Sequence, residues 1–148
     1  MLLSQIKPNL FVGNVFSLNR LTLKSNNITH VISLIEIPSQ IQKKNPEISF
    51  QTFPFPDDPT VDLISMCQKI YPDLLARLEN GTVSVCCNAG KSRSVSVIIY
   101  YLIVNDALNF NQAYSLVCER HPAACLNRGF YQQLSNFTSY LSQLNQLG

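Results

Sequence analysis

The sequence predicts an α/β protein with a central, mainly parallel twisted sheet of about four to five strands flanked by helices. Short apolar runs rich in β-branched residues alternate along the chain with longer segments that have helical spacing of apolar residues. In addition, residues 94–105 are apolar nearly all round, which is typical of a helix buried on several sides. Strands that alternate with helices form parallel sheets covered on both faces.

The first half of the chain supplies three expected strands and one short helix. Each strand is a β-branched or alternating apolar run that ends near glycine, asparagine or proline. The expected strands are Leu10–Val12, His30–Leu34 and Ile48–Phe55, and the expected helix is Ser17–Ser25. The segment between Pro38 and Pro46 is rich in Gln and Lys, and we expect it to be a polar connection.

The second half supplies four expected helices and one strand. A helix begins near Thr60–Asp62 and ends at Asn80-Gly81, and Pro72 is expected to kink it or split it in two. Its apolar face consists of Leu63, Met66, Ile70, Leu74 and Leu78. The other expected elements are a buried strand at Val83–Cys86 and helices at Ser94–Asn105, Asn109–Arg120 and Asn127–Leu144.

Size and composition indicate one globular domain over residues 1–148, since 46% of the residues are hydrophobic and 14% are charged. A net charge of +2 does not favour nucleic acid as a general partner. The five cysteines lack the spacing of a disulfide scaffold. No leader peptide, membrane anchor or lipidation motif is evident. We therefore expect a cytoplasmic protein that could also enter the nucleus, with free thiols. The sequence leaves the oligomeric state open.

The most informative segment is the loop that joins the buried strand to the apolar helix. It runs from Cys87 to Arg93, and backbone N–H groups at the start of the following helix form a cradle that suits a phosphate. A thiol near a helix N-terminus and cations is readily ionised to the nucleophilic thiolate. The guanidinium of Arg93 can bind two phosphate oxygens at once. Gly90 permits a backbone conformation that other residues avoid. The loop can therefore hold a phosphate and attack it.

The residues CNAGKSRS resemble the signature loop of the cysteine-dependent protein phosphatases, in the form found in the small, atypical dual-specificity members. The resemblance extends from Ile6-x-Pro8-x-Leu10 to Asn127-Arg128-Gly129-Phe130-x-x-Gln133-Leu134, which is nearly the whole chain. In one respect the chain departs from the family, because Cys86 stands where a histidine usually precedes the nucleophile.

The resemblance assigns roles to the loop residues. Cys87 is the implied nucleophile, and Ser94 is the hydroxyl that hydrogen-bonds its sulfur. Asn127 is the implied brace of the loop, although it also fits a helix cap, and one side chain could serve both purposes. The implied phosphate-binding residues are Asn88, Ala89, Gly90, Lys91, Ser92 and Arg93.

A general acid is also needed, because the leaving oxygen must be protonated. The segment Phe53-Pro54-Phe55-Pro56-Asp57-Asp58-Pro59 resembles the family's acid loop, and its apolar-Pro-apolar pattern places Asp57 on the acid. Asp58 is the competing candidate, while Asp62 fits a helix cap.

Three further features of the sequence each have a simpler interpretation. Lys91 matches a lysine in the signature loops of lipid phosphatases. Those loops have a second lysine, but Asn88 occupies its position here. Arg120 and His121 could bind a second phosphate group. The simpler interpretation is that they are positively charged residues at the carboxyl-terminal end of a helix. Cys118-x2-His121-x3-Cys125 resembles a set of three metal ligands without a fourth, and we expect no metal or cofactor.

Two functions fit the sequence. The first is a dual-specificity protein phosphatase that hydrolyses phosphotyrosine and phosphoserine/phosphothreonine in phosphoproteins through a phosphocysteine intermediate, without a cofactor. The second is a phosphate-binding module with little turnover, which the missing histidine suggests. A third possibility keeps the catalysis of the first function, but its substrate is a lipid phosphate, a glucan phosphate or an RNA 5′ phosphate.

Overall fold

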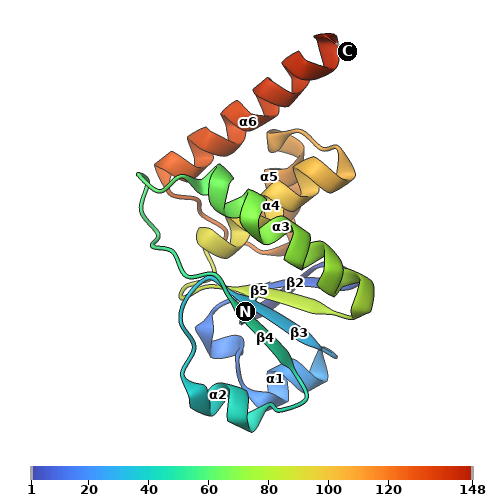
Figure 1. Ribbon diagram of the computed structural model, residues 1–148, viewed down its shortest axis with the longest axis vertical. Coiled ribbons are helices and arrows are strands. Elements are labelled where there is room, and N and C mark those ends of the chain that lie inside the picture. The colour runs from blue at the N-terminus through green and yellow to red at the C-terminus, as the bar shows by residue number, and fades with distance from the viewer. Residues whose placement is uncertain (1, 148) are drawn as a thin grey trace.

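The computed structural model describes residues 2–147 and consists of a central sheet between two layers of helices (Figure 1). The strands are β1 Leu3–Lys7, β2 Leu10–Gly13, β3 His30–Ser33, β4 Ser49–Thr52 and β5 Val83–Cys86. The helices are α1 Arg20–Ser25, α2 Ser39–Lys44, α3 Leu63–Asn80, α4 Arg93–Asp106, α5 Phe110–Arg120 and α6 Arg128–Leu147, and a 3₁₀ turn η1 spans Val15–Ser17. The α/β class and the mainly parallel sheet predicted from the sequence are confirmed.

The strands lie in the order β1-β2-β5-β3-β4, and only the β1–β2 pair is antiparallel among the described strands. The parallel strands are in close register at their carboxyl ends: Gly13 and Ser33 both lie opposite Cys86, and Ser33 lies opposite Thr52. As a result, the segments that follow β2, β3, β4 and β5 emerge at the same edge of the sheet, where α/β proteins commonly bind ligands.

The two faces of the sheet bury cores of different size. Helices α3 to α6 cover one face, while α1 and α2 cover the other (Figure 1). The larger core includes Val12, Val85 and most of α4, whose residues 94–103 are all buried. The smaller core includes Phe11, Val31 and Cys86. Alternating residues of each strand thus enter opposite cores.

The structure corrects three details of the sequence interpretation. Leu3–Lys7 is a strand that was not expected, and its pairing with β2 shifts register between Gln5 and Lys7. The polar connection contains the short helix α2. Helix α3 is continuous through Pro72 and is not split in two. Proline removes one hydrogen bond to the carbonyl of residue 68, and Gln68 is exposed, so solvent can satisfy that carbonyl.

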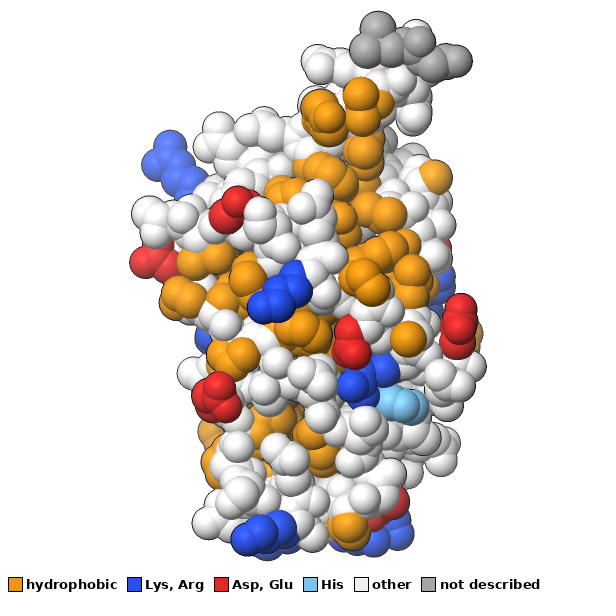
Figure 2. Space-filling view, viewed as in Figure 1, with side chains coloured by type: hydrophobic (Ala, Val, Ile, Leu, Met, Phe, Trp, Pro, Cys, Tyr) orange, Lys and Arg blue, Asp and Glu red, His pale blue; other side chains and the backbone are white. Residues whose placement is uncertain are grey.

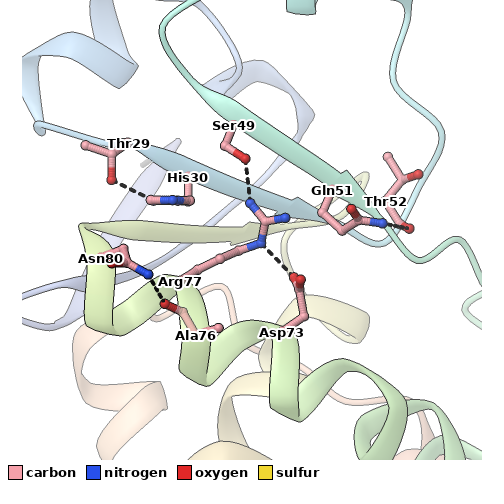
Figure 3. Close-up of polar contacts among 9 residues, drawn as sticks. All are labelled: Thr29, His30, Ser49, Gln51, Thr52, Asp73, Ala76, Arg77 and Asn80. Atoms are coloured by element: carbon pink, nitrogen blue, oxygen red, sulfur yellow. Dashed lines mark hydrogen bonds and ion pairs between the residues drawn. The ribbon is translucent and has the colours of Figure 1, made fainter.

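A polar cluster joins α3 to the outer strands of the sheet (Figure 3). Arg77 donates from Nε to Asp73 at 2.7 Å and from a terminal nitrogen to Ser49 Oγ at 2.7 Å. Near it, Thr29 Oγ1 and His30 Nδ1 are 2.8 Å apart. Burial is the main reason that the pKa of His30 is lowered, and the Arg77 charge adds to it. The cluster holds the carboxyl-terminal half of α3 against β3 and β4.

The carboxyl-terminal part of α6 projects beyond the other helices (Figure 1). Hydrophobic side chains continue up this projecting part of the surface (Figure 2), and Tyr140 and Leu144 are exposed there. Across residues 2–147, no helix combines the length and hydrophobicity needed to span a bilayer.

Candidate active site

Three chain segments meet at the carboxyl edge of the sheet. The loop after β5 carries the signature residues, the segment after β4 carries the two candidate acids, and the connection before α6 carries Asn127. Residues from all three line one cavity of about 320 Å³. The lining residues are Asp57, Cys87, Asn88, Ala89, Lys91, Ser92, Arg93, Cys125, Leu126 and Asn127.

The backbone of the signature loop has its carbonyl groups held on the outside. The carbonyl of Asn88 accepts from Val15 N–H at 3.1 Å, that of Lys91 accepts from Cys125 N–H at 2.8 Å, and that of Gly90 accepts from the His121 ring at 2.6 Å. In a planar trans peptide the N–H points opposite to the C=O. The N–H groups that follow these three carbonyls therefore point toward the cavity, which makes an anion-binding cradle.

Gly90 is essential to this loop conformation. Its φ of +68° lies in the left-handed region, which disfavours side chains with a Cβ. A Cβ at this position would also lie 3.1 Å from the backbone of Gly13. The lack of a side chain therefore lets the loop turn tightly over the end of β2.

Cys87 lies at the floor of the loop and is 2% exposed. Its Sγ is 3.2 Å from Ser94 Oγ in the first turn of α4, and its N–H donates to Gly13 O at 3.4 Å. A serine hydroxyl at this distance can donate a hydrogen bond to a thiolate. Because Ser94 lies in the first turn of α4, the sulfur is close to the end of that helix that carries the positive partial charge.

The neighbouring Cys86 lies on the other side of the sheet. It is fully buried in the smaller core. Burial raises the pKa of its thiol to about 12, a shift that a hydrogen bond with Ser33 opposes. Since strand side chains alternate between faces, the two consecutive cysteines pack into different cores.

Arg93 begins α4 and reaches across to the segment after β4. One terminal nitrogen donates to the carbonyl of Phe55 at 2.9 Å. Its Nε is buried and has no hydrogen-bond partner among residues 2–147. Because a buried donor without a partner is costly, this geometry suits an anion that accepts from Nε within the cradle.

The three aspartates of the acid segment have different partners. Asp58 accepts from the hydroxyl and the N–H of Thr60, and these bonds lower its pKa. Asp62 accepts from the hydroxyl and N–H of Ser65 at the start of α3, and its pKa is lowered in the same way. Asp57 instead lines the cavity and accepts from Asn127 Nδ2 at 2.8 Å. Of the three, only Asp57 lies in the cavity.

Asn127 connects the loop, the acid segment and α6. Its N–H donates to Ser92 Oγ at 3.0 Å, its Nδ2 donates to Asp57, and its Oδ1 accepts from Phe130 N–H at 2.9 Å. The last contact is a helix cap. One side chain thus caps α6 and holds the candidate acid at the cavity.

Two residues near the site were not recognised from the sequence as contributing to it. Gln133 in α6 accepts from Leu63 N–H and donates to Val61 O, which holds the end of the acid segment. A glycine at position 129 allows Pro59 to lie against α6, because a Cβ there would be 2.1 Å from the Pro59 carbonyl oxygen. Both residues belong to the closing sequence pattern, which was the available indication of their importance.

His121 is buried at the end of α5 and does not lie on the surface, which corrects the simpler interpretation of this residue. It is 3% exposed, and both of its ring nitrogens lie within hydrogen-bond distance of protein oxygens, Gly90 O and Ser4 Oγ. In residues 2–147 no group of three or more His, Cys, Asp and Glu side chains is placed to bind a metal ion.

A larger cavity of about 560 Å³ lies between α4 and α6. Its lining includes Tyr100, Phe137 and Leu141 but no Lys, Arg, His, Asp, Glu or Cys among the described residues. Of these two cavities, the one at the signature loop is therefore the one lined by a cysteine, an arginine and an aspartate.

Comparison with known proteins identifies the family. Residues 10–140 match the family model described as dual specificity phosphatase, catalytic domain. The chain belongs to the dual specificity phosphatases. It is 31% identical to dual specificity protein phosphatase 1B of Arabidopsis thaliana, over 91% of this chain and 81% of that protein. It is also 31% identical to dual specificity protein phosphatase 22-B of Danio rerio, over 97% of this chain and 79% of that protein.

Other dual specificity phosphatases are longer than the matched region. The chain spans 35% of a probable dual specificity protein phosphatase of Dictyostelium discoideum and 60% of mouse dual specificity protein phosphatase 19. Among solved structures, a mouse putative dual specificity phosphatase complexed with zinc tungstate has a TM-score of 0.85 and 25% identity. That match covers 97% of this chain and 91% of the mouse chain.

Proposed function

We propose that this chain is the catalytic domain, over residues 1–148, of a protein phosphatase that forms a phosphocysteine intermediate. Its substrates are phosphotyrosine and phosphoserine/phosphothreonine side chains of phosphoproteins. The observation that carries the proposal is the arrangement around Cys87, whose sulfur lies 3.2 Å from Ser94 Oγ at the floor of an anion cradle. Membership of the dual specificity phosphatases supports the substrate class.

In the first step, the Cys87 thiolate attacks phosphorus and the bond from phosphorus to the substrate oxygen breaks. Asp57 donates its proton to the departing oxygen. The inward N–H groups of the loop and the guanidinium of Arg93 bind the phosphoryl oxygens, where negative charge is concentrated in the transition state. The free Nε of Arg93 supports this role.

In the second step, water attacks the phosphorus of phosphocysteine and the sulfur leaves as thiolate. Asp57, now ionised, accepts the proton of the attacking water. The Ser94 hydroxyl donates a hydrogen bond to the departing sulfur. The step releases inorganic phosphate and restores Cys87 and Asp57 to their initial states.

Asp57 is preferred to Asp58 as the acid for two reasons. Asp57 lines the cavity, and its contact with Asn127 fixes its position beside the loop. Asp58 does not line the cavity, and its carboxylate accepts from the hydroxyl and the N–H of Thr60, which lowers its pKa. A general acid works best when its pKa lies near the operating pH.

We further propose that the domain works in the cytoplasm. All five cysteines are unpaired in the structure, including the buried Cys67 and Cys86. Free thiols fit a reducing compartment.

The test compares wild type with Cys87→Ser, using Cys118→Ser as the matched control because Cys118 lies outside the site cavity. We expect Cys87→Ser to lower hydrolysis of an aryl phosphate by at least about 10³-fold, while Cys118→Ser retains wild-type turnover. Trapping should show a phosphorylated Cys87 in wild type. A wild type that turns over no faster than Cys87→Ser, yet binds orthophosphate, would instead identify a phosphate-binding module.

A further inference from the structure

His121 lies at the carboxyl-terminal end of α5 and reaches the outside of the signature loop. It is 3% exposed, its Nε2 is 2.6 Å from Gly90 O, and its Nδ1 is 2.7 Å from Ser4 Oγ in β1. These two contacts join segments that are 31 and 117 residues away in the sequence. The mechanism proposed above does not use this buried histidine.

The hydrogen-bond pattern fixes the role of each ring nitrogen. A carbonyl oxygen can only accept, so Nε2 carries the proton and donates to Gly90 O. In the neutral ring Nδ1 then accepts, and the Ser4 hydroxyl is its donor. The contact with Ser4 therefore stabilises the tautomer that can donate to the loop.

Peptide geometry transmits this contact to the phosphate site. The carbonyl of Gly90 and the N–H of Lys91 belong to one planar unit and point in opposite directions. When His121 holds the carbonyl outward, the Lys91 N–H points toward the cavity, which Lys91 lines. Gly90 has the widest backbone freedom in the loop, so this peptide is the one most able to rotate without an external contact.

The three hydrogen bonds to the loop carbonyls come from two kinds of donor, main-chain N–H groups and a side chain. Main-chain N–H groups of Val15 and Cys125 hold the carbonyls of Asn88 and Lys91. A side chain holds the carbonyl between them, that of Gly90. In this chain Cys86 occupies the position before the nucleophile and faces the smaller core. The histidine just after α5 thus contacts the loop, although the residue immediately before Cys87 is not a histidine.

We propose that His121 is a positioning residue of the phosphate site, which keeps the Lys91 N–H directed at the bound phosphoryl group. The inference rests on the proposed function for its catalytic consequence, but the expected effect on oxyanion binding does not require turnover.

The test uses two substitutions of His121 and a control at the other histidine. His121→Phe keeps an aromatic ring and removes the donor, whereas His121→Gln supplies an amide N–H for Gly90 O. His30→Phe is the control, because His30 lies beside Arg77 and away from the cavity (Figure 3). Measurements are kcat and KM with an aryl phosphate, the dissociation constant for tungstate, and the unfolding temperature without ligand.

We expect His121→Phe to weaken tungstate binding about 10-fold and to lower kcat/KM about 10- to 100-fold, as loss of one aligned N–H donor does. His121→Gln should recover both values to within about threefold of wild type, and His30→Phe should leave both unchanged. If the folded His121→Phe and His121→Gln variants lost tungstate affinity and kcat/KM to the same extent, the proposal would be overturned, because lost packing and not a lost hydrogen-bond donor would be responsible. Unchanged tungstate binding in folded His121→Phe would also overturn it.

A measurement on the wild-type protein covers the case in which the variants do not fold. Nitrogen-15 NMR of the His121 ring should show a protonated Nε2, the nitrogen that donates to Gly90 O. The opposite tautomer would contradict donation to Gly90 O. If wild type binds tungstate but turns over no substrate, the proposed function fails while the tungstate comparison still decides the role of His121.

Discussion

Two clusters in this molecule contain the same kinds of residue, an arginine with a histidine, a serine and an aspartate nearby, yet their chemistry differs. At the edge of the sheet Arg77 donates to Asp73 and to Ser49 (Figure 3). At the carboxyl ends of the strands Arg93 donates to a backbone carbonyl, and its buried Nε has no partner in the described part of the chain.

The difference lies in the charge balance around each guanidinium. The carboxylate of Asp73 neutralises Arg77 locally, so that cluster contributes to stability and has little affinity for another anion. Near Arg93 the nearest candidate carboxylate, Asp57, is held by Asn127. The loop N–H groups add positive potential to that of Arg93. The unsatisfied donor of Arg93 is therefore the feature that supports its proposed role as a phosphate ligand.

The largest expected effect comes from removing each arginine in turn. Arg93→Met should lower kcat/KM for an aryl phosphate about 10³-fold, because the transition state loses its guanidinium. Arg77→Met should leave kcat/KM within about twofold and lower the free energy of unfolding by about 1 kcal/mol. Steady-state kinetics and urea denaturation of both variants measure these quantities. Similar kinetic losses in both variants would show that Arg93 acts on structure rather than on phosphate.

The second-largest expected effect comes from Asp57→Asn and distinguishes Asp57, the proposed general acid, from the adjacent Asp58. Asp57→Asn should slow hydrolysis of an alkyl phosphate about 10²- to 10⁴-fold, since a poor leaving group needs the proton. An aryl phosphate with a good leaving group should be affected much less. Asp58→Asn is the matched control and should stay within about threefold of wild type on both substrates. Larger losses in Asp58→Asn than in Asp57→Asn would reverse the assignment.

The smallest effect concerns the histidine beside Arg77. The pKa of His30 is lowered, mainly by burial and also by Arg77, while Asp73 opposes the shift. Arg77→Met should therefore raise the pKa of His30, and an NMR titration of the imidazole protons measures it. Because the folded state favours neutral His30, its contribution to stability is present at higher pH and is lost as pH falls below the ordinary value of 6.5. A pKa of His30 that fell in Arg77→Met would contradict the assigned role of the arginine charge.

Much of the site could be predicted because its residues are close together in the sequence. The strand, the loop from Cys87 to Arg93 and the apolar helix form one continuous motif, and a glycine at position 90 indicates the tight turn. Strand alternation also explains why Cys86, next to the nucleophile candidate, lies in the smaller core. Local periodicity also predicted α3 to α6 with small errors at their ends.

Other features depended on packing that sequence patterns do not specify. In strand β1 the polar residues Ser4 and Gln5 separate Leu3 from Ile6, so the apolar residues do not alternate, and the pairing with β2 shifts register between Gln5 and Lys7. Helix α3 continues through Pro72 because tertiary contacts outweigh one lost hydrogen bond. The apolar-Pro-apolar pattern favoured Asp57 over the adjacent Asp58, but only the structure shows that the two carboxylates have different hydrogen-bond partners.

The sequence by itself determined the α/β class, the phosphate loop and the pairing of a thiol with an arginine, because these follow from local spacing along one strand, loop and helix. The tertiary structure alone decided that His121 and Ser4 lie behind Gly90, and that Asn127 lies beside Asp57. Such contacts join residues 31 to 117 positions apart. Their geometry arises from the register of the parallel strands and the packing of α5 and α6, so no local pattern in the sequence records it.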